Sequence, residues 1–360
     1  MSSQHILQLA KYYPPIYGGI ELVEKMLTRA HVELGDKVFI VAFKDQSDFS
    51  PNGEFGEKIE WLKTHLELKS ALFNWGFFLK FRDYIVHNKI KKIYVHLPNP
   101  YMHELVRMNK QFLKDNNIVV HAIYHSDIVN QKFLKFFYNL YFVFTSNVYS
   151  SLIVSSDKLW NYSKVLARIP IEKKRVLPFC TEGNMTYIHR TEFKGKLLAI
   201  GRLVPYKGFE FLVNAINGTE YELHIIGDGP LIQILQSIKG KNIHLHRKLS
   251  EKDKNELIAQ SDLLIVSSIN QAEAYGMIIV EAFESGMPVV ASNLNSGVTF
   301  LVQHNITGRV FETLNKDSLL SEIRYFKENR VEYSSTSKKV REFYDKELSF
   351  SCFKERVKNL

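Results

Sequence analysis

One loop in the second half of the chain carries two cations at a spacing that suits a phosphorylated ligand. Arg202 and Lys207 lie five residues apart in the loop 201–208, directly after the apolar run 197–200. Arg offers a planar fork of donors and Lys a compact point charge, so together they can neutralise a diphosphate without a metal ion. Loops after the carboxyl ends of parallel strands are where open α/β sheets bind ligands. Two solvated surface cations are the alternative interpretation.

A second segment, 270–283, places two glutamates on either side of seven residues. We predict a helix that starts near Tyr275 or Gly276, with Glu273 ahead of it and Glu281 inside it. A fully helical segment would separate the two carboxylates by about 12 Å, the span from a sugar across a diphosphate to a ribose. Backbone amides at the helix start would hold the phosphates, namely those of Ala274, Tyr275, Gly276 and Met277. The alternative is that Glu281 is an exposed point on an amphipathic helix.

The first half offers a glycine pair and one histidine. Gly18 and Gly19 lie where a loop becomes a helix, and a helix N-terminus attracts phosphate. A plain tight turn explains the pair equally well, and the Gly-x-Gly-x-x-Gly fingerprint is missing. His125 follows the predicted strand 119–124 and would face a ligand cleft, although a lone histidine is more often structural.

The elements that position these residues follow an alternation of short apolar runs and amphipathic helical stretches, which is typical of parallel sheets with crossover helices. Strands are predicted at 6–9, 38–42, 92–96 and 119–124, and again at 197–200, 222–226, 242–246, 263–266 and 289–290. We therefore predict two doubly wound α/β domains, 1–180 and 181–340, joined by a linker within 169–194. A C-terminal helix, 341–360, would pack back across the face between the domains.

Composition limits the class of protein. The 360 residues are 45% hydrophobic and 24% charged, as in a folded globular protein of two domains. Two cysteines without zinc-site spacing predict neither disulfides nor a structural zinc. The net charge is +9, and residues 1–185 hold 24 Lys and Arg against 17 Asp and Glu. A basic half of this kind suits an anionic membrane, an acidic acceptor or nucleic acid, or is ordinary surface charge.

Taken together, these segments resemble the retaining glycosyltransferases of family 4, which have the GT-B fold of two Rossmann-like domains facing across a cleft. The resemblance extends over the whole chain and is strongest in 198–311, where 225–230 and 286–291 also match the family pattern. It implies that Arg202 and Lys207 bind the donor diphosphate, that Glu273 touches the donor sugar and that Glu281 binds the ribose. Leu249 would lie by the base and His125 would face the donor sugar.

The same resemblance implies the reaction and its partners. We expect a hexose to move from a UDP- or GDP-sugar to a saccharide or lipid-linked acceptor, in surface polysaccharide or lipopolysaccharide synthesis, with no cofactor and no metal. A sugar-nucleotide epimerase of the same architecture and a catalytically degenerate binding protein remain as alternatives. No nucleic-acid motif accompanies the charge.

The sequence also bears on location. The N-terminus shows no signal peptide, and no apolar segment reaches the roughly 20 residues of a spanning helix. We expect a cytoplasmic protein. The aromatic segment 131–142 with its interspersed lysines slightly favours peripheral contact with the anionic inner face of the cytoplasmic membrane, and core packing is the alternative.

Overall fold

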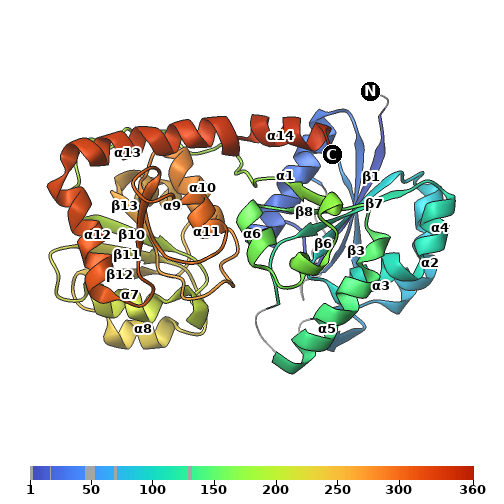
Figure 1. Ribbon diagram of the computed structural model, residues 1–360, viewed down its shortest axis with the longest axis horizontal. Helices are drawn as coiled ribbons and strands as arrows, with labels where there is room; N and C mark the ends of the chain where they lie inside the picture. Colours follow the sequence, from blue (N-terminus) through green and yellow to red (C-terminus); the bar gives the residue numbers. More distant parts are fainter. Residues whose placement is uncertain (1–2, 17, 45–52, 69–70, 129–131) are drawn as a thin grey trace. The chain divides into compact units, whose positions relative to one another are not determined.

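The computed structural model describes residues 3–16, 18–44, 53–68, 71–128 and 132–360, without the side chains of 132–136. The chain divides into two compact units. The first unit comprises Met1–Cys180 and Phe350–Leu360, and the second comprises Thr181–Ser349. Helices pack against both faces of the large sheet in each unit (Figure 1).

The first unit is built on a seven-stranded parallel sheet in the order β3-β2-β1-β6-β7-β8-β9. Its strands are β1 (His5–Leu9), β2 (Lys37–Phe43), β3 (Lys58–Leu62), β6 (Lys92–Leu97), β7 (Val119–Tyr124), β8 (Ser151–Val154) and β9 (Lys174–Val176). A small antiparallel hairpin adds β4 (Leu66–Leu68) and β5 (Ala71–Phe73). The helices are α1 (Gly19–Glu33), α2 (Trp75–His87), α3 (Pro100–Met108), α4 (Lys110–Asp115), α5 (Lys132–Thr145), α6 (Asp157–Tyr162) and α14 (Phe350–Lys358).

The second unit is built on a six-stranded parallel sheet in the order β12-β11-β10-β13-β14-β15. Its strands are β10 (Lys196–Ile200), β11 (Glu222–Ile226), β12 (Ile243–His246), β13 (Leu263–Val266), β14 (Val289–Ser292) and β15 (Gly308–Phe311). The helices are α7 (Phe209–Ile216), α8 (Ile232–Ile238), α9 (Glu251–Gln260), α10 (Met277–Glu284), α11 (Gly297–Leu301), α12 (Lys316–Glu328) and α13 (Arg330–Phe343), and a π-helical turn (Tyr344–Leu348) follows α13.

Both sheets have a topological switch point, where chain order reverses between neighbouring strands. In the first unit it lies between β1 and β6, and in the second between β10 and β13. Open α/β sheets bind ligands at the carboxyl ends of the strands at such a point. The fold therefore directs attention to the loops that follow these four strands.

Two expectations differ from the structure. Strand β9 lies inside the predicted linker, because Leu152–Val154 of β8 pairs with Lys174–Val176. The predicted helix 341–360 is not one helix: α13 ends at Phe343 and α14 begins at Phe350. Helix α14 packs beside α1 within the first unit (Figure 1). There the guanidinium of Arg29 lies 3.9 Å from the centroid of the Phe350 ring.

No helix among the described residues is long and apolar enough to cross a membrane.

Candidate active site

Lys207 and Glu273 form an ion pair across the switch point of the second sheet. The ammonium of Lys207, in the loop after β10, contacts Oε2 of Glu273, in the loop after β13. The hydroxyl of Ser268 donates to the same oxygen over 3.0 Å. The Glu273 residue is 7% exposed, so the charges are held in a largely dry place. The structure thus brings together two of the predicted site residues that lie 66 positions apart.

The pair keeps Lys207 charged. Burial alone would lower the pKa of Lys207, but the carboxylate of Glu273 and, to a smaller extent, Tyr206 raise it above its ordinary value. Lys207 is therefore a cation over the whole physiological range. An ammonium has three donors, so one remains directed at Glu273 while others are available to a ligand oxygen.

Backbone contacts fix the loop that carries Lys207. The amide of Ile269 donates to the carbonyl of Tyr206 over 2.8 Å, and the hydroxyl of Ser267 donates to the carbonyl of Lys207 over 2.9 Å. Gly208 has φ +69°, and a Cβ there would lie 2.1 Å from the carbonyl oxygen of Ser267. Only glycine combines this backbone conformation with so close an approach. The loops after β10 and β13 therefore form one rigid support.

Arg202 extends from the same loop into solvent. It is exposed and, within the described part of the chain, makes no side-chain hydrogen bond or ion pair. Its charge acts on Lys207, whose pKa it lowers slightly against the larger effect of Glu273. The amide of the next residue, Leu203, donates to the carbonyl of Asp228 over 2.8 Å, which ties this loop to the one after β11. The guanidinium of Arg202 is therefore accessible to a ligand, and the backbone of its loop is fixed.

The start of α10 follows Glu273. Gly276 caps the helix with φ +86°, and Met277 is its first residue, as the predicted start near Tyr275 or Gly276 requires. Ala274 and Tyr275 are buried, and the amide of Gly297 donates to the carbonyl of Ala274 over 2.8 Å. The turn at Ala274–Gly276 therefore fixes the orientation of the backbone amides at the start of α10.

Glu281 lies inside α10 and has a partner that the sequence did not predict. Its Oε2 forms an ion pair with the ammonium of Lys254 on α9, 3.3 Å away. Burial raises the pKa of Glu281, and Lys254 opposes that shift. Glu281 is therefore not an exposed point on an amphipathic helix. The predicted base-side residue Leu249 is half-buried between β12 and α9, next to Ser250, whose hydroxyl caps α9.

His125 lies in the first unit, directly after β7, in a chain of buried side chains. Its Nε2 is 3.0 Å from Nδ1 of His96, the penultimate residue of β6. Nε2 of His96 is 2.9 Å from Oε1 of Gln8 on β1. His96 and Gln8 were not predicted as site residues, because each lies within an apolar strand.

The hydrogen bonds between Gln8, His96 and His125 determine which ring nitrogen of each histidine carries the proton. Nε2 of Gln8 donates to Thr28, so its Oε1 faces His96 as an acceptor. His96 therefore donates from Nε2, and its Nδ1 accepts from Nε2 of His125. Burial lowers the pKa of His125 to about 3, and burial followed by the charge of His125 lowers that of His96 well below its usual range. His125 is a neutral imidazole whose Nδ1 carries the lone pair.

A buried carboxyl lies beside these hydrogen-bonded side chains. Both oxygens of Glu24, on α1, lie without a hydrogen-bond partner among the described residues, and Oε1 is 3.7 Å from Nδ1 of His96. Burial raises the pKa of Glu24 well above its usual range. Asp127, close to His125 in sequence, instead accepts hydrogen bonds from Tyr124 over 2.7 Å and Ser163 over 2.6 Å. Asp127 therefore anchors the loop.

Gly18 and Gly19 form the N-terminal end of α1 in the first unit. Gly18 is the N-cap with φ −166°, an extended conformation open to any residue, and Gly19 begins the helix. Both are exposed. A Cβ on Gly18 would lie 2.3 Å from Oε2 of Glu21, so a carboxylate already covers this helix end. Burial raises the pKa of Glu21.

Helix α5 contains most of the aromatic segment that the sequence singled out. Phe137, Leu140, Tyr141 and Phe144 are exposed and share one face at helical spacing, whereas Phe142 is buried. Residue 131 lies outside the described residues, as do the side chains of 132–136. Core packing therefore accounts for only one face of α5.

Comparison with known proteins finds a family match within the second unit. Residues 189–343 match the family model described as Glycosyl transferases group 1. The chain is 27% identical over 318 residues to the D-rhamnosyltransferase WbpZ of Pseudomonas aeruginosa, covering 83% of this chain and 80% of that protein. It is 24% identical over 322 residues to the O-antigen chain mannosyltransferase C of Escherichia coli, covering 86% and 84%.

Solved structures agree over nearly the whole chain. The sucrose-phosphate synthase of Thermosynechococcus elongatus superposes with a TM-score of 0.79 at 16% identity, covering 99% of this chain and 98% of that one. Alr3699/HepE of Anabaena, solved in complex with UDP-glucose, gives 0.75 at 16% identity, covering 99% and 98%. The predicted fold class, two Rossmann-like parallel-sheet domains of the GT-B type, is confirmed.

Proposed function

We propose that this chain is a retaining glycosyltransferase of family 4 that transfers a hexose from a UDP- or GDP-sugar to a saccharide or lipid-linked saccharide. The observation that carries the proposal is the Lys207–Glu273 ion pair at the switch point of a group 1 glycosyltransferase domain. A fixed cation beside a fixed carboxylate suits a ligand that joins a diphosphate to a sugar.

In this proposal Lys207 and Arg202 bind the diphosphate and stabilise its charge as it leaves. Lys207 is held charged by Glu273, and Arg202 presents its fork to solvent. Preorganised cations of this kind stabilise a leaving group without a metal ion. Glu273 accepts from hydroxyls of the donor sugar.

The remaining residues of the second unit hold the rest of the donor. Amides at the start of α10 bind phosphate oxygens, because a helix N-terminus carries partial positive charge. Glu281, held beside the ammonium of Lys254, binds the ribose diol, and Leu249 packs by the base.

The first unit contributes His125 and the end of α1. Because His125 is neutral with its lone pair on Nδ1, it accepts a hydrogen bond from a hydroxyl of the transferred sugar. Gly18 and Gly19 offer amides to a donor phosphate once Glu21 moves aside.

The chemical step follows from these roles. The acceptor hydroxyl oxygen bonds to the anomeric carbon on the face from which the diphosphate departs, and the bond between that carbon and the phosphate oxygen breaks. The hydroxyl proton passes to the donor phosphate. No protein nucleophile is required, and configuration is retained.

The relatives support a role in surface polysaccharide synthesis. One is named for a D-rhamnosyl transfer and the other for O-antigen chain mannosyl transfer. Both names describe transfer to an acceptor, so epimerisation and binding without turnover are not favoured.

We also propose that the protein works on the inner face of the cytoplasmic membrane. The exposed apolar face of α5 and the positive charge of residues 1–185 suit an anionic bilayer surface. Phe144→Ser should weaken co-sedimentation with phosphatidylglycerol vesicles, and Leu79→Ser, a change at an exposed residue of α2, should not. Equal retention of both variants would remove this part of the proposal.

The enzymatic proposal is tested by acceptor-dependent turnover. Thermal-shift measurements with UDP, GDP and their sugar conjugates, with and without chelator, identify the donor, because a ligand that binds the folded state stabilises it. Arg202→Ala should then lower the transfer rate in the presence of that donor. An undiminished rate would overturn the assignment of Arg202, and no shift with any nucleotide would favour a binding protein without turnover.

A further inference from the structure

A cluster of histidines and one glutamate lies on the edge of the second sheet. Glu222 and His224 are alternate residues of β11, and His244 lies directly opposite His224 on the edge strand β12. Their neighbours Leu223, Ile225 and Ile243 belong to the hydrophobic core. Since side chains alternate between the faces of a strand, the cluster occupies the face away from that core.

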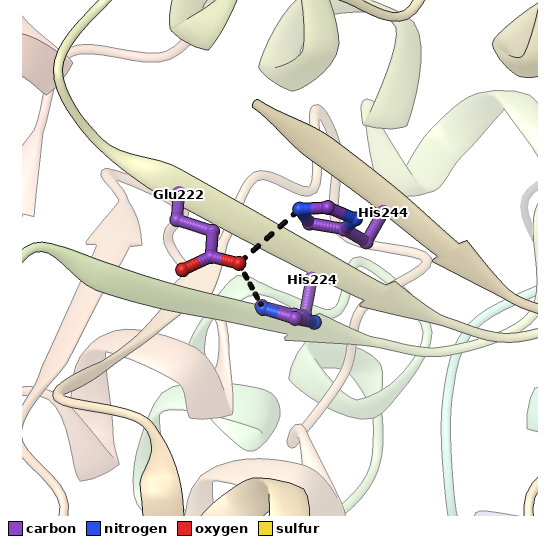
Figure 2. A group of neighbouring side chains, drawn as sticks. All are labelled: Glu222, His224 and His244. Atoms are coloured by element: carbon purple, nitrogen blue, oxygen red, sulfur yellow. Dashed lines mark hydrogen bonds and ion pairs between the residues drawn. The ribbon is translucent and has the colours of Figure 1, made fainter. Parts of the chain in front are cut away.

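The three side chains point toward one another (Figure 2). Oε1 of Glu222 is 3.2 Å from Nε2 of His224 and 3.2 Å from Nε2 of His244. One nitrogen or oxygen from each residue lies within 4.8 Å of the other two. The imidazole rings of His224 and His244 stack with centroids 4.8 Å apart.

The two glutamate–histidine distances match the spacing of ligand atoms around a small cation, and the third ligand-atom distance is at most 4.8 Å. Zinc binds imidazole nitrogen and carboxylate oxygen at about 2.0–2.2 Å in tetrahedral geometry, which places neighbouring ligand atoms about 3.3–3.5 Å apart. Both glutamate–histidine distances are close to that value. Two imidazoles and a carboxylate are ligands that zinc, nickel and copper prefer, and magnesium and calcium do not.

We propose that Glu222, His224 and His244 bind a divalent transition metal ion of the zinc type. Three protein ligands leave the fourth tetrahedral position to water. The side chains of Glu222 and His244 are 40% and 44% exposed, so an ion reaches the site from solvent, and His224, at 15%, forms its floor.

His246 supports the site from behind. Its Nε2 is 3.0 Å from Nδ1 of His224, on the side of the ring away from Glu222. When Nε2 of His224 binds a metal, its Nδ1 carries the proton and donates a hydrogen bond to Nε2 of His246. Metal-binding histidines usually have such a partner, which fixes the ring and its tautomer.

The site has a structural consequence separate from glycosyl transfer. Glu222 is the first residue of β11, whereas the proposed donor site lies beyond the carboxyl ends of the strands. Strand β12 has four residues and lies at the edge of the sheet, next to β11. A metal ion would cross-link this short edge strand to β11 and raise the stability of the second unit.

The test is a zinc titration of the full chain after chelator treatment, in competition with a chromogenic chelator. We expect one equivalent bound and a higher melting temperature. His244→Ala and Glu222→Gln should each weaken binding by at least a hundredfold, and His246→Ala by roughly tenfold. His87→Ala, a change at an exposed histidine of α2, is the matched control and should bind as the unchanged chain does.

Cobalt distinguishes this site from the two thiols, Cys180 and Cys352. Nitrogen and oxygen ligands give only weak visible bands, whereas a thiolate adds intense near-ultraviolet absorption. Circular dichroism of the metal-free variants establishes that they fold. Zinc binding that survives in folded His244→Ala and Glu222→Gln, thiolate bands, or no binding at saturating zinc would each overturn the proposal, and none of them bears on transfer.

Discussion

At the carboxyl ends of its strands the first unit holds buried neutral imidazoles, whereas the second holds a charged lysine and glutamate. In the first, His125 and His96 are joined by hydrogen bonds, and burial keeps both uncharged. In the second, the Glu273 carboxylate keeps Lys207 charged despite burial. A buried charge persists only beside an opposite charge, and a buried group without one becomes neutral. The same place in two similar sheets therefore supplies hydrogen-bond acceptance in one unit and charge in the other.

Removing the charge from the second unit should have the largest effect. Lys207→Ala should lower the transfer rate roughly 10²- to 10³-fold, the usual loss for one preorganised group that stabilises developing charge. Initial rates with saturating donor and acceptor measure it. Lys241→Ala, at an exposed lysine of the same unit, is the control and should be neutral.

A double variant separates the charge from its structural role. Lys207→Ala leaves the buried Glu273 unpaired, which destabilises a protein by roughly 3–5 kcal/mol. Lys207→Met with Glu273→Gln removes both charges and should recover stability without recovering transfer. A double variant that regained full activity would show that the pair only holds the loops together.

Lowering the pH should destabilise the first unit more than the second. Among the described residues of the first unit, burial lowers the pKa values of five histidines: to about 3 for His125, to about 4 for His103 and His121, well below the usual range for His96, and below the ordinary value for His31. Below pH 6.5 the unfolded chain binds protons that the folded unit does not, so stability is present above that pH and is lost as pH falls toward 4. Between pH 7 and 5 the loss is roughly 1 to 2 kcal/mol per histidine. Glu24, with a raised pKa, offsets part of it.

The second unit should lose less stability than the first, because carboxyls with raised pKa values oppose the effect of His224 and His246, whose pKa values burial lowers. Burial raises the pKa values of Asp262, Glu281 and Glu284. In the folded state these carboxyls bind protons at a higher pH than in the unfolded state. Acidification toward pH 5 therefore lowers the free-energy cost of burying them. The chain's three tryptophans, Trp61, Trp75 and Trp160, lie in the first unit. Denaturation followed by tryptophan fluorescence should therefore weaken more between pH 7 and 5 than denaturation followed by circular dichroism. Equal losses by both probes would contradict the contrast.

A smaller effect should follow from the acceptor in the first unit. His125→Phe removes the lone pair at similar size and should lower kcat/KM about tenfold, the value of one neutral hydrogen bond of about 0.5–1.5 kcal/mol. His125→Asn offers an oxygen near the position of Nδ1 and should recover most of that loss. If both variants match the unchanged chain, His125 has only a structural role, bonded to His96 and packed against Phe179, whose ring lies 5.5 Å away.

The sequence predicted most of the strands, including the edge strand β12, but missed the buried strand β8 and the edge strands β3, β9 and β15. Runs such as 263–266 are apolar throughout and match β13. Strand β3 alternates half-buried and exposed residues, and β9 has three residues, two of them cations. Neither contains an apolar run, so only pairing with a neighbouring strand makes it a strand.

For the candidate site, the sequence singled out residues but not the contacts between them. Arg202, Lys207 and Glu273 stand out because they lie in loops after predicted parallel strands, where open α/β sheets bind ligands. That Lys207 touches Glu273 depends on β10 and β13 being neighbours, which local pattern does not reveal. Lys254 was missed because it lies on a charged helix.

The histidine cluster, by contrast, left a signal that was not used. Glu-x-His within 222–224 and His-x-His within 244–246 have the two-residue period that places side chains on one face of a strand. Both segments were predicted as strands. The sequence pattern did not show that these two strands are neighbours in the sheet.

The glycine loop of the first unit should give the smallest change in stability. Gly18 has an extended backbone, and an added Cβ would meet only the mobile end of Glu21, so Gly18→Ala should change the free energy of unfolding by less than about 0.5 kcal/mol. Gly208→Ala in the second unit should cost at least about 1–3 kcal/mol, because its φ is +69° and its Cβ would strike the backbone of Ser267. Because the stability of Gly18→Ala is unchanged, its KM for the donor can be interpreted directly.

Glu21→Gln should lower the KM for the donor if phosphate binds at this helix end, because the carboxylate no longer repels the phosphate. An unaltered KM in both Gly18→Ala and Glu21→Gln would leave the glycine pair as a turn and assign donor phosphate binding to the second unit.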